Sequence, residues 1–128
     1  MRPQDRPRQC RSIKSNLKMN KLFIALVVVA ASISSAYAGT SGPGNIINPY
    51  FMQNGALLVT TDASQSGAPS CATVINRWAI DATTPAGKLQ ATAVLTAYAM
   101  GKKIAIWGTG TCSVWGDTEG VSFLQVIN

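Results

Sequence analysis

The sequence contains no histidine, and this absence removes the usual general base and a common metal ligand from consideration. Without histidine, a serine or threonine nucleophile lacks its ordinary activating partner. The few cysteines do not have the spacing of a zinc centre. We therefore expect a protein that is not an enzyme and that uses no metal and no other cofactor.

Acidic residues are scarce, and the basic residues are unevenly placed. The 128-residue chain has a formal net charge of +6 at pH 7. All of this excess lies before residue 22, where seven basic residues accompany Asp5. From residue 39 onward, four basic residues balance four acidic ones. A neutral domain without a basic cluster binds nucleic acid poorly, so we expect no nucleic-acid partner.

The sequence also lacks an apolar run long enough to cross a bilayer, which takes about 20 residues. Its main apolar run, Leu22 to Ala31, follows basic residues and has about half that length. The small residues of Ala36-Tyr37-Ala38 come soon after it. This combination is typical of a secretory signal peptide that is cleaved after Ala38.

Two regions are therefore expected. Residues 1–38 are interpreted as an N-terminal extension and a cleaved signal peptide, and Met19 is an alternative start that would give a more compact signal peptide. Residues 39–128 are interpreted as a single exported domain, periplasmic or secreted, with no membrane insertion after cleavage.

Cysteine is also rare, and Cys10 lies in the part that we expect to be removed. The remaining pair, Cys71 and Cys112, would reach an oxidising compartment, where one disulfide is expected. Two free thiols are the alternative. Closing a loop of about 41 residues would stabilise the fold by about 4 kcal/mol on the chain-entropy model. That contribution matters in a domain of about 90 residues, whose core is small.

A helix is predicted from residue 85 to residue 100. Thr83 or Thr84 can cap its first turn, and Pro85 suits the first helical position. Gly101 suits the end, because glycine adopts the left-handed conformation without a steric clash.

The predicted helix has apolar residues on most of its sides. The residues at helical spacing that we expect to be buried are Leu89, Ala93, Ala97 and Met100. The opposite face, with Leu95 and Tyr98, is also apolar and would remain uncovered in a monomer. An exposed apolar patch usually marks an interface, so a homo-oligomer is expected.

Five strands are predicted around the helix, and Asn54-Gly55 predicts a hairpin between the first two. The segments before and between them, residues 39–45 and 62–70, are expected to be a flexible lead-in and a polar loop. The predicted strands are residues 46–52, 56–61, 71–80, 103–108 and 121–127.

The predicted order places three strands before the helix and two after it. The expected fold is α+β and mainly β: a small five-stranded antiparallel barrel with one helix between strands three and four. This is the arrangement of the oligonucleotide/oligosaccharide-binding (OB) barrel. An open antiparallel sheet with one helix is the alternative.

A resemblance covers most of the region after residue 38. It is carried by Cys71, Arg77-Trp78, the segment from Val94 to Ile104 and the segment from Gly108 to Glu119. These residues resemble a group of small exported bacterial proteins of uncharacterised function. More loosely, the helix followed by KKIAIWGTGTC is similar to the B subunits of AB5 toxins. That similarity implies a disulfide-pinned OB barrel that binds glycans as a pentamer, without assigning binding residues.

Four residues are candidates for a ligand site. Trp107 and Trp115 offer aromatic rings that can stack on sugars, and Trp115 lies in a glycine-rich loop. For Trp115, packing against the disulfide is the alternative. Asp117 and Glu119 are two residues apart and can serve acid/base chemistry or bind a cation, or can simply be solvated.

The sequence therefore favours an exported, non-enzymatic binding or interaction module with a glycan or protein ligand. The alternative is a small periplasmic enzyme or inhibitor that uses the loop from Trp115 to Glu119.

Overall fold

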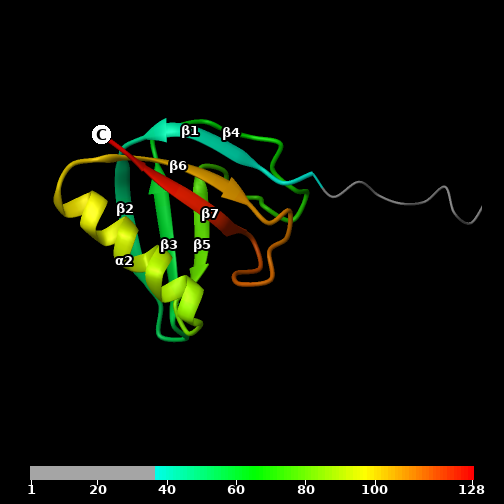
Figure 1. Cartoon of the computed structure of the whole chain (residues 1–128). Coiled ribbons are helices and arrows are strands. Elements are labelled where there is room, and N and C mark those ends of the chain that lie inside the picture. The colour runs from blue at the N-terminus through cyan, green and yellow to red at the C-terminus, as the bar shows by residue number, and fades with distance from the viewer. Residues whose placement is uncertain (1–36) are drawn as a thin grey trace, which may run out of the picture. The chain divides into compact units, whose positions relative to one another are not determined.

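The computed structural model describes residues 37–128, in which one helix and seven strands form a mainly β, α+β unit (Figure 1). The predicted signal peptide, apart from its last two residues, lies outside the described residues. No helix within residues 37–128 is long and apolar enough to cross a membrane. The elements are β1 (Thr40–Gly44), β2 (Ile46–Phe51), β3 (Ala56–Thr61), β4 (Gln65–Ser66), β5 (Arg77–Asp81), α2 (Pro85–Ala99), β6 (Lys103–Gly108) and β7 (Glu119–Ile127).

The strands form one sheet in the order β2-β3-β5-β7-β6-β1-β4. Neighbouring strands are antiparallel, except that β5 and β7 are parallel. Only Asn45 separates β1 from β2, yet β1 pairs with β6 and β2 pairs with β3. The chain therefore links distant parts of the sheet order, and the sheet curls into a half-barrel (Figure 1).

The predicted count of five strands is wrong, because β1 and β4 lie in segments that we expected to be irregular. The β1 sequence, TSGPG, has no apolar alternation, and tertiary pairing with β6 determines its extended form. Gly44 at its end packs closely: a Cβ there would lie 2.6 Å from the Cβ of Ala63. The two residues of β4 pair with the outer edge of β1.

The third predicted strand begins at Arg77 rather than at Cys71. Asn76 has a positive φ of 61°, which interrupts an extended chain. Its main chain and side chain exchange hydrogen bonds with Gln65: Asn76 N donates to Gln65 Oε1, and Gln65 N donates to Asn76 Oδ1. Val74 and Ile75, which we assigned to this strand, are therefore exposed in a turn region.

The predicted ends of the helix and the hairpin are confirmed. The Thr84 hydroxyl accepts a hydrogen bond from Gly87 N at 3.0 Å, and Pro85 occupies the first turn. Gly101 follows the helix with φ 64°. Gly55 has φ 84° in the hairpin turn between β2 and β3, where Met52 N donates to Ala56 O.

The predicted buried face of α2 is correct at Ala97 and wrong at Leu89 and Met100. Leu89 and Met100 are 75% and 63% exposed, whereas the buried residues are Gly87, Ala91, Val94 and Ala97. These residues are small, which allows the helix axis to approach the sheet closely. At Gly87, a Cβ would lie only 1.8 Å from the carbonyl oxygen of Asp81. Close packing at small residues, rather than the size of the apolar side chains, orients the helix.

The core lies between α2 and the concave face of the sheet. Alternate residues of the central strands point into it, as the period of a half-buried strand requires. Trp78, Ile104 and Ile106 are fully buried. The core residues are Ile46, Leu57, Val59, Trp78, Ile80, Ala91, Val94, Ala97, Ile104 and Ile106.

Candidate functional site

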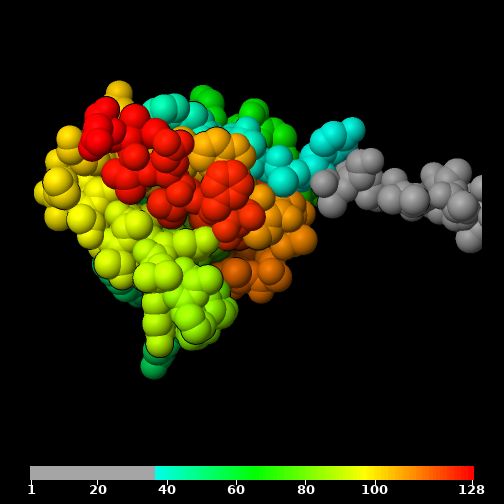
Figure 2. Space-filling view, in the orientation of Figure 1, coloured from blue at the N-terminus to red at the C-terminus, as the bar shows by residue number. Residues whose placement is uncertain are grey.

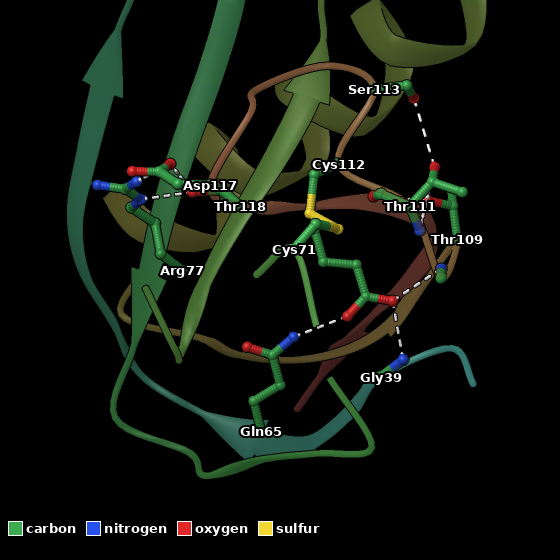
Figure 3. The surroundings of a disulfide bond; sticks show 12 residues. Gly39, Gln65, Cys71, Arg77, Thr109, Thr111, Cys112, Ser113, Asp117 and Thr118 are labelled. Atoms are coloured by element: carbon green, nitrogen blue, oxygen red, sulfur yellow. Dashed lines mark hydrogen bonds and ion pairs between the residues drawn. A yellow bond between two sulfur atoms is a disulfide. The ribbon is translucent and has the colours of Figure 1, made fainter. Parts of the chain in front are cut away.

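A disulfide joins the turn before β5 to the loop between β6 and β7. The predicted pairing of Cys71 with Cys112 is confirmed, with a Cα–Cα distance of 6.1 Å (Figure 3). Val74 N also donates to the carbonyl oxygen of Asp117, at 3.2 Å. The loop of residues 109–118, called the crossing loop below, is therefore fixed to the turn of residues 71–76 at two points.

A salt bridge fixes the end of the crossing loop. Arg77 donates from a terminal nitrogen to Asp117 Oδ1 at 2.5 Å and from Nε to Thr118 Oγ1 at 2.8 Å (Figure 3). Thr118 Oγ1 in turn donates to Asp117 Oδ1 at 2.9 Å. The hydrogen bond from Thr118 and the neighbouring Arg77 guanidinium lower the pKa of the Asp117 carboxyl below its usual value. Asp117 is thus ionised and already paired.

Glu119, the next acidic residue, is fully buried. Its Oε1 accepts hydrogen bonds from the main-chain nitrogens of Gly39 and Gly110, each at 2.8 Å. Its Oε2 accepts one from Gln65 Nε2, also at 2.8 Å. Asp117 and Glu119 therefore do not form a pair of surface carboxylates, since Glu119 is buried and both of its oxygens accept hydrogen bonds from the protein.

The two candidate tryptophans occupy different places. Trp107 on β6 is half-buried and stacks on Phe123 of β7, with ring centroids 4.6 Å apart and planes 9° apart. Phe123 is 54% exposed, so this stacked pair forms part of the surface. Trp115 is half-buried in the crossing loop, where its carbonyl oxygen accepts a hydrogen bond from Thr118 N at 3.0 Å.

Trp115 lines an open hollow of about 440 Å³ together with the tip of the β2–β3 hairpin. The other lining residues are Met52, Gln53 and Asn54. The Asn54 side-chain oxygen accepts a hydrogen bond from Ala56 N at 3.2 Å, which holds the amide in place within the turn. The hollow thus combines one aromatic ring with two side-chain amides and a methionine.

The sequence did not associate the hairpin tip with Trp115. The Asn54-Gly55 turn was recognised, but nothing local indicates that residues 52–54 and Trp115 meet across about 60 positions of sequence. A second, smaller groove of about 250 Å³ lies between this hairpin and α2 and includes Phe51, Ala91 and Leu95.

Within residues 37–128, no group of three or more His, Cys, Asp and Glu side chains is placed to hold a metal ion. The four predicted site residues do not form one site. Trp115 lies in a hollow, Trp107 in a surface stack, Asp117 in a salt bridge and Glu119 in the interior. The hollow beside Trp115 is the part of this region best suited to a small ligand, because aromatic and amide groups meet there.

Comparison with known protein families, curated proteins and solved structures finds no match to this chain.

Proposed function

We propose that residues 39–128 form an exported, non-catalytic binding module that recognises a glycan in the hollow beside Trp115. The observation that carries this proposal is the meeting of the Trp115 ring with the amides of Gln53 and Asn54 around a space of about 440 Å³. A sugar presents apolar C–H faces that stack on an indole and hydroxyls that exchange hydrogen bonds with amides. The disulfide and the Arg77–Asp117 pair hold the loop in place, so less ordering accompanies binding.

The fold that we propose for this module is an OB-like barrel. β1 and β2 are joined through Asn45 and pair with opposite parts of the sheet order, so together they act as one bent first strand. The helix lies between β5 and β6, and β5 is parallel to β7. These features support the similarity to the B subunits of AB5 toxins, with β4 as an additional short strand.

We also propose that the module is a homo-oligomer. The outer face of α2 carries Leu89 and Met100, both largely exposed, and the edge strand β2 exposes Tyr50 and Phe51. Figure 2 shows α2 at the surface beside β7, with no other part of the described chain covering it in that view. A repeated contact in a closed ring is a common way to bury such a surface.

Enzymatic use of the crossing loop has less support. Asp117 is engaged by Arg77, and both oxygens of Glu119 accept hydrogen bonds from the protein. A carboxylate pair with one proton donor and one base is therefore not assembled there.

A glycan array tests the proposed function. The oxidised protein starting at Gly39 should bind a restricted set of glycans, and Trp115→Ala should weaken that binding at least about tenfold, because a stacked ring and its buried area are lost. Trp107→Ala is the matched control, since Trp107 lies outside the hollow. If glycan binding survives Trp115→Ala but is lost in Trp107→Ala, the site is the Trp107–Phe123 stack instead. If the oxidised oligomer binds no glycan on the array, the proposal is contradicted.

A further inference from the structure

The buried carboxylate of Glu119 has no cationic partner among residues 37–128. Its three donors, Gly39 N, Gly110 N and Gln65 Nε2, are all neutral, and the ion pair in this part of the chain is Arg77–Asp117. Dashed lines in Figure 3 run from Gly39 and Gln65 to this carboxylate. Burying an anion without a cation is unfavourable, so the site is incomplete in electrostatic terms.

Glycines surround the carboxylate closely. A Cβ on Gly39 would lie 2.3 Å from Glu119 Oε2, and one on Gly108 would lie 2.0 Å from Oε1. The Gly39 carbonyl oxygen accepts a hydrogen bond from Gly108 N at 2.7 Å, which holds the two main chains together. The main-chain nitrogen of Gly39 is therefore held within hydrogen-bond distance of the Glu119 carboxylate. A side chain at Gly39 or Gly108 would displace this carboxylate.

Gly39 is also the residue that follows the expected cleavage site. Tyr37 and Ala38 are exposed, whereas Gly39 is buried, so the Ala38–Gly39 bond marks the edge of the folded unit. Hydrolysis by a signal peptidase adds one water across this bond. Ala38 leaves as a carboxylate, and the nitrogen of Gly39 becomes an amine that takes up a proton near neutral pH.

We infer that the new α-ammonium group of Gly39 forms a buried ion pair with Glu119. Cleavage of the precursor then adds an ionic contact that stabilises the folded state. The nitrogen already lies 2.8 Å from Glu119 Oε1, and protonation turns a neutral hydrogen bond into a charge-assisted one. The additional N–H groups occupy the side that Ala38 leaves. Because Ala38 is exposed, water can reach them there.

The ion pair between Gly39 and Glu119 would connect several elements at one end of the half-barrel. Glu119 begins β7 and pairs with Trp78 of β5, Gly39 leads into β1, and Gln65 belongs to β4. Gly110 lies in the crossing loop. The precursor can make the same contacts with an amide nitrogen but lacks the charge, so the mature chain is the more stable form.

Three forms of the oxidised domain test this inference: one with a free amine on Gly39, one acetylated on Gly39, and one extended by Ala38. The acetylated form keeps the N–H but removes the charge, and the extended form moves the charge one residue outward. At pH 6 the free form should melt about 4–8 °C higher than both others, the shift that a gain of about 1 kcal/mol gives in a domain of this size. Equal melting temperatures in all three forms would overturn the inference.

The dependence on pH gives a second test. An α-amino group ordinarily has a pKa of about 7.7–8.0, and a carboxylate partner raises it. The extra stability is then complete below about pH 7.7 and is lost as the pH rises through the raised value. The groups that contact Glu119 from β4, the crossing loop and the segment before β1 are an amide side chain and main-chain nitrogens, so no side chain among them titrates in this range.

Glu119→Gln should abolish the difference between the free and acetylated forms, even if it lowers both melting temperatures. If this variant does not fold, an NMR titration of the Gly39 amine in the unsubstituted protein replaces it: a pKa above 8.0 supports the pair, and an ordinary value contradicts it. The inference rests on the proposed export and on cleavage after Ala38, but not on glycan binding. Intact-mass measurement of exported protein should give a chain starting at Gly39; a different start would overturn the inference and leave the glycan array result unaffected.

Discussion

At the scale of single residues, the carboxylates within residues 37–128 connect segments rather than forming a reactive pair. Asp117 holds Arg77 and Thr118, and Asp62 accepts hydrogen bonds from the main chain and side chain of Asn45. The hydrogen bonds from Asn45 lower the pKa of Asp62, as those from Thr118 and Arg77 lower that of Asp117. The ionised forms of these groups therefore stabilise the folded state.

This leads to a prediction about acid stability. Because the pKa of Asp117 is lowered on folding, its contribution is present above the unfolded value of about 3.9 and is lost as the pH falls through the folded value. Asp117→Asn should make the melting temperature less dependent on pH below about 4, as followed by circular dichroism. Ser113→Ala, an uncharged change in the same loop, should leave that slope unchanged. If Asp117→Asn keeps the full slope, the Arg77 contact adds nothing to stability.

At the scale of elements, the disulfide is the connection with the largest expected effect. It closes a loop with a sequence separation of 41, for which the chain-entropy model gives about 4 kcal/mol. Replacing both cysteines by alanine should therefore lower the melting temperature by more than about 10 °C in thermal unfolding. Reduction of the unsubstituted protein should give a similar decrease. A decrease of only a few degrees would mean that the Arg77–Asp117 and Val74–Asp117 contacts already fix the crossing loop.

The elements also show what the sequence could and could not predict. Cap residues and turn glycines act locally, so the helix from Pro85 and the turn at Gly55 were predicted correctly. β1 is extended because it pairs with β6, and its own residues do not indicate this. The buried face of α2 was predicted correctly only at Ala97. The helix has apolar residues of its own on most sides, and close approach at Gly87 decides which of them are buried.

The candidate site was predicted only in part, for a related reason. The disulfide followed from the cysteine count and the expected compartment, and it is confirmed. The burial of Glu119 could not be predicted from its spacing to Asp117, because it depends on contacts with Gly39 and Gln65, which are distant in sequence. Residue type indicated the chemistry at each position, whereas the fold decided which groups are free to use it.

At the scale of the whole molecule, the exposed outer face of α2 predicts assembly. Light scattering coupled to gel filtration should give a mass several times that of one chain, and Leu89→Lys should shift it toward the monomer, because a charge would be buried in the contact. Thr73→Lys, at an exposed polar position outside α2, is the control and should leave the mass unchanged. A monomer at tens of micromolar in the unsubstituted protein would contradict the homo-oligomer.

The most direct test of the proposed function is an NMR titration that follows the tryptophan indole N–H resonances of the oxidised protein starting at Gly39. The three tryptophans occupy distinct environments: Trp78 is buried in the core, Trp107 is stacked on Phe123, and Trp115 lines the hollow. With a glycan selected on the array, we predict that the Trp115 resonance moves in proportion to occupancy while the other two stay in place. A saturable shift at Trp107 with Trp115 unmoved, or no shift at any indole, would contradict glycan recognition in the hollow beside Trp115.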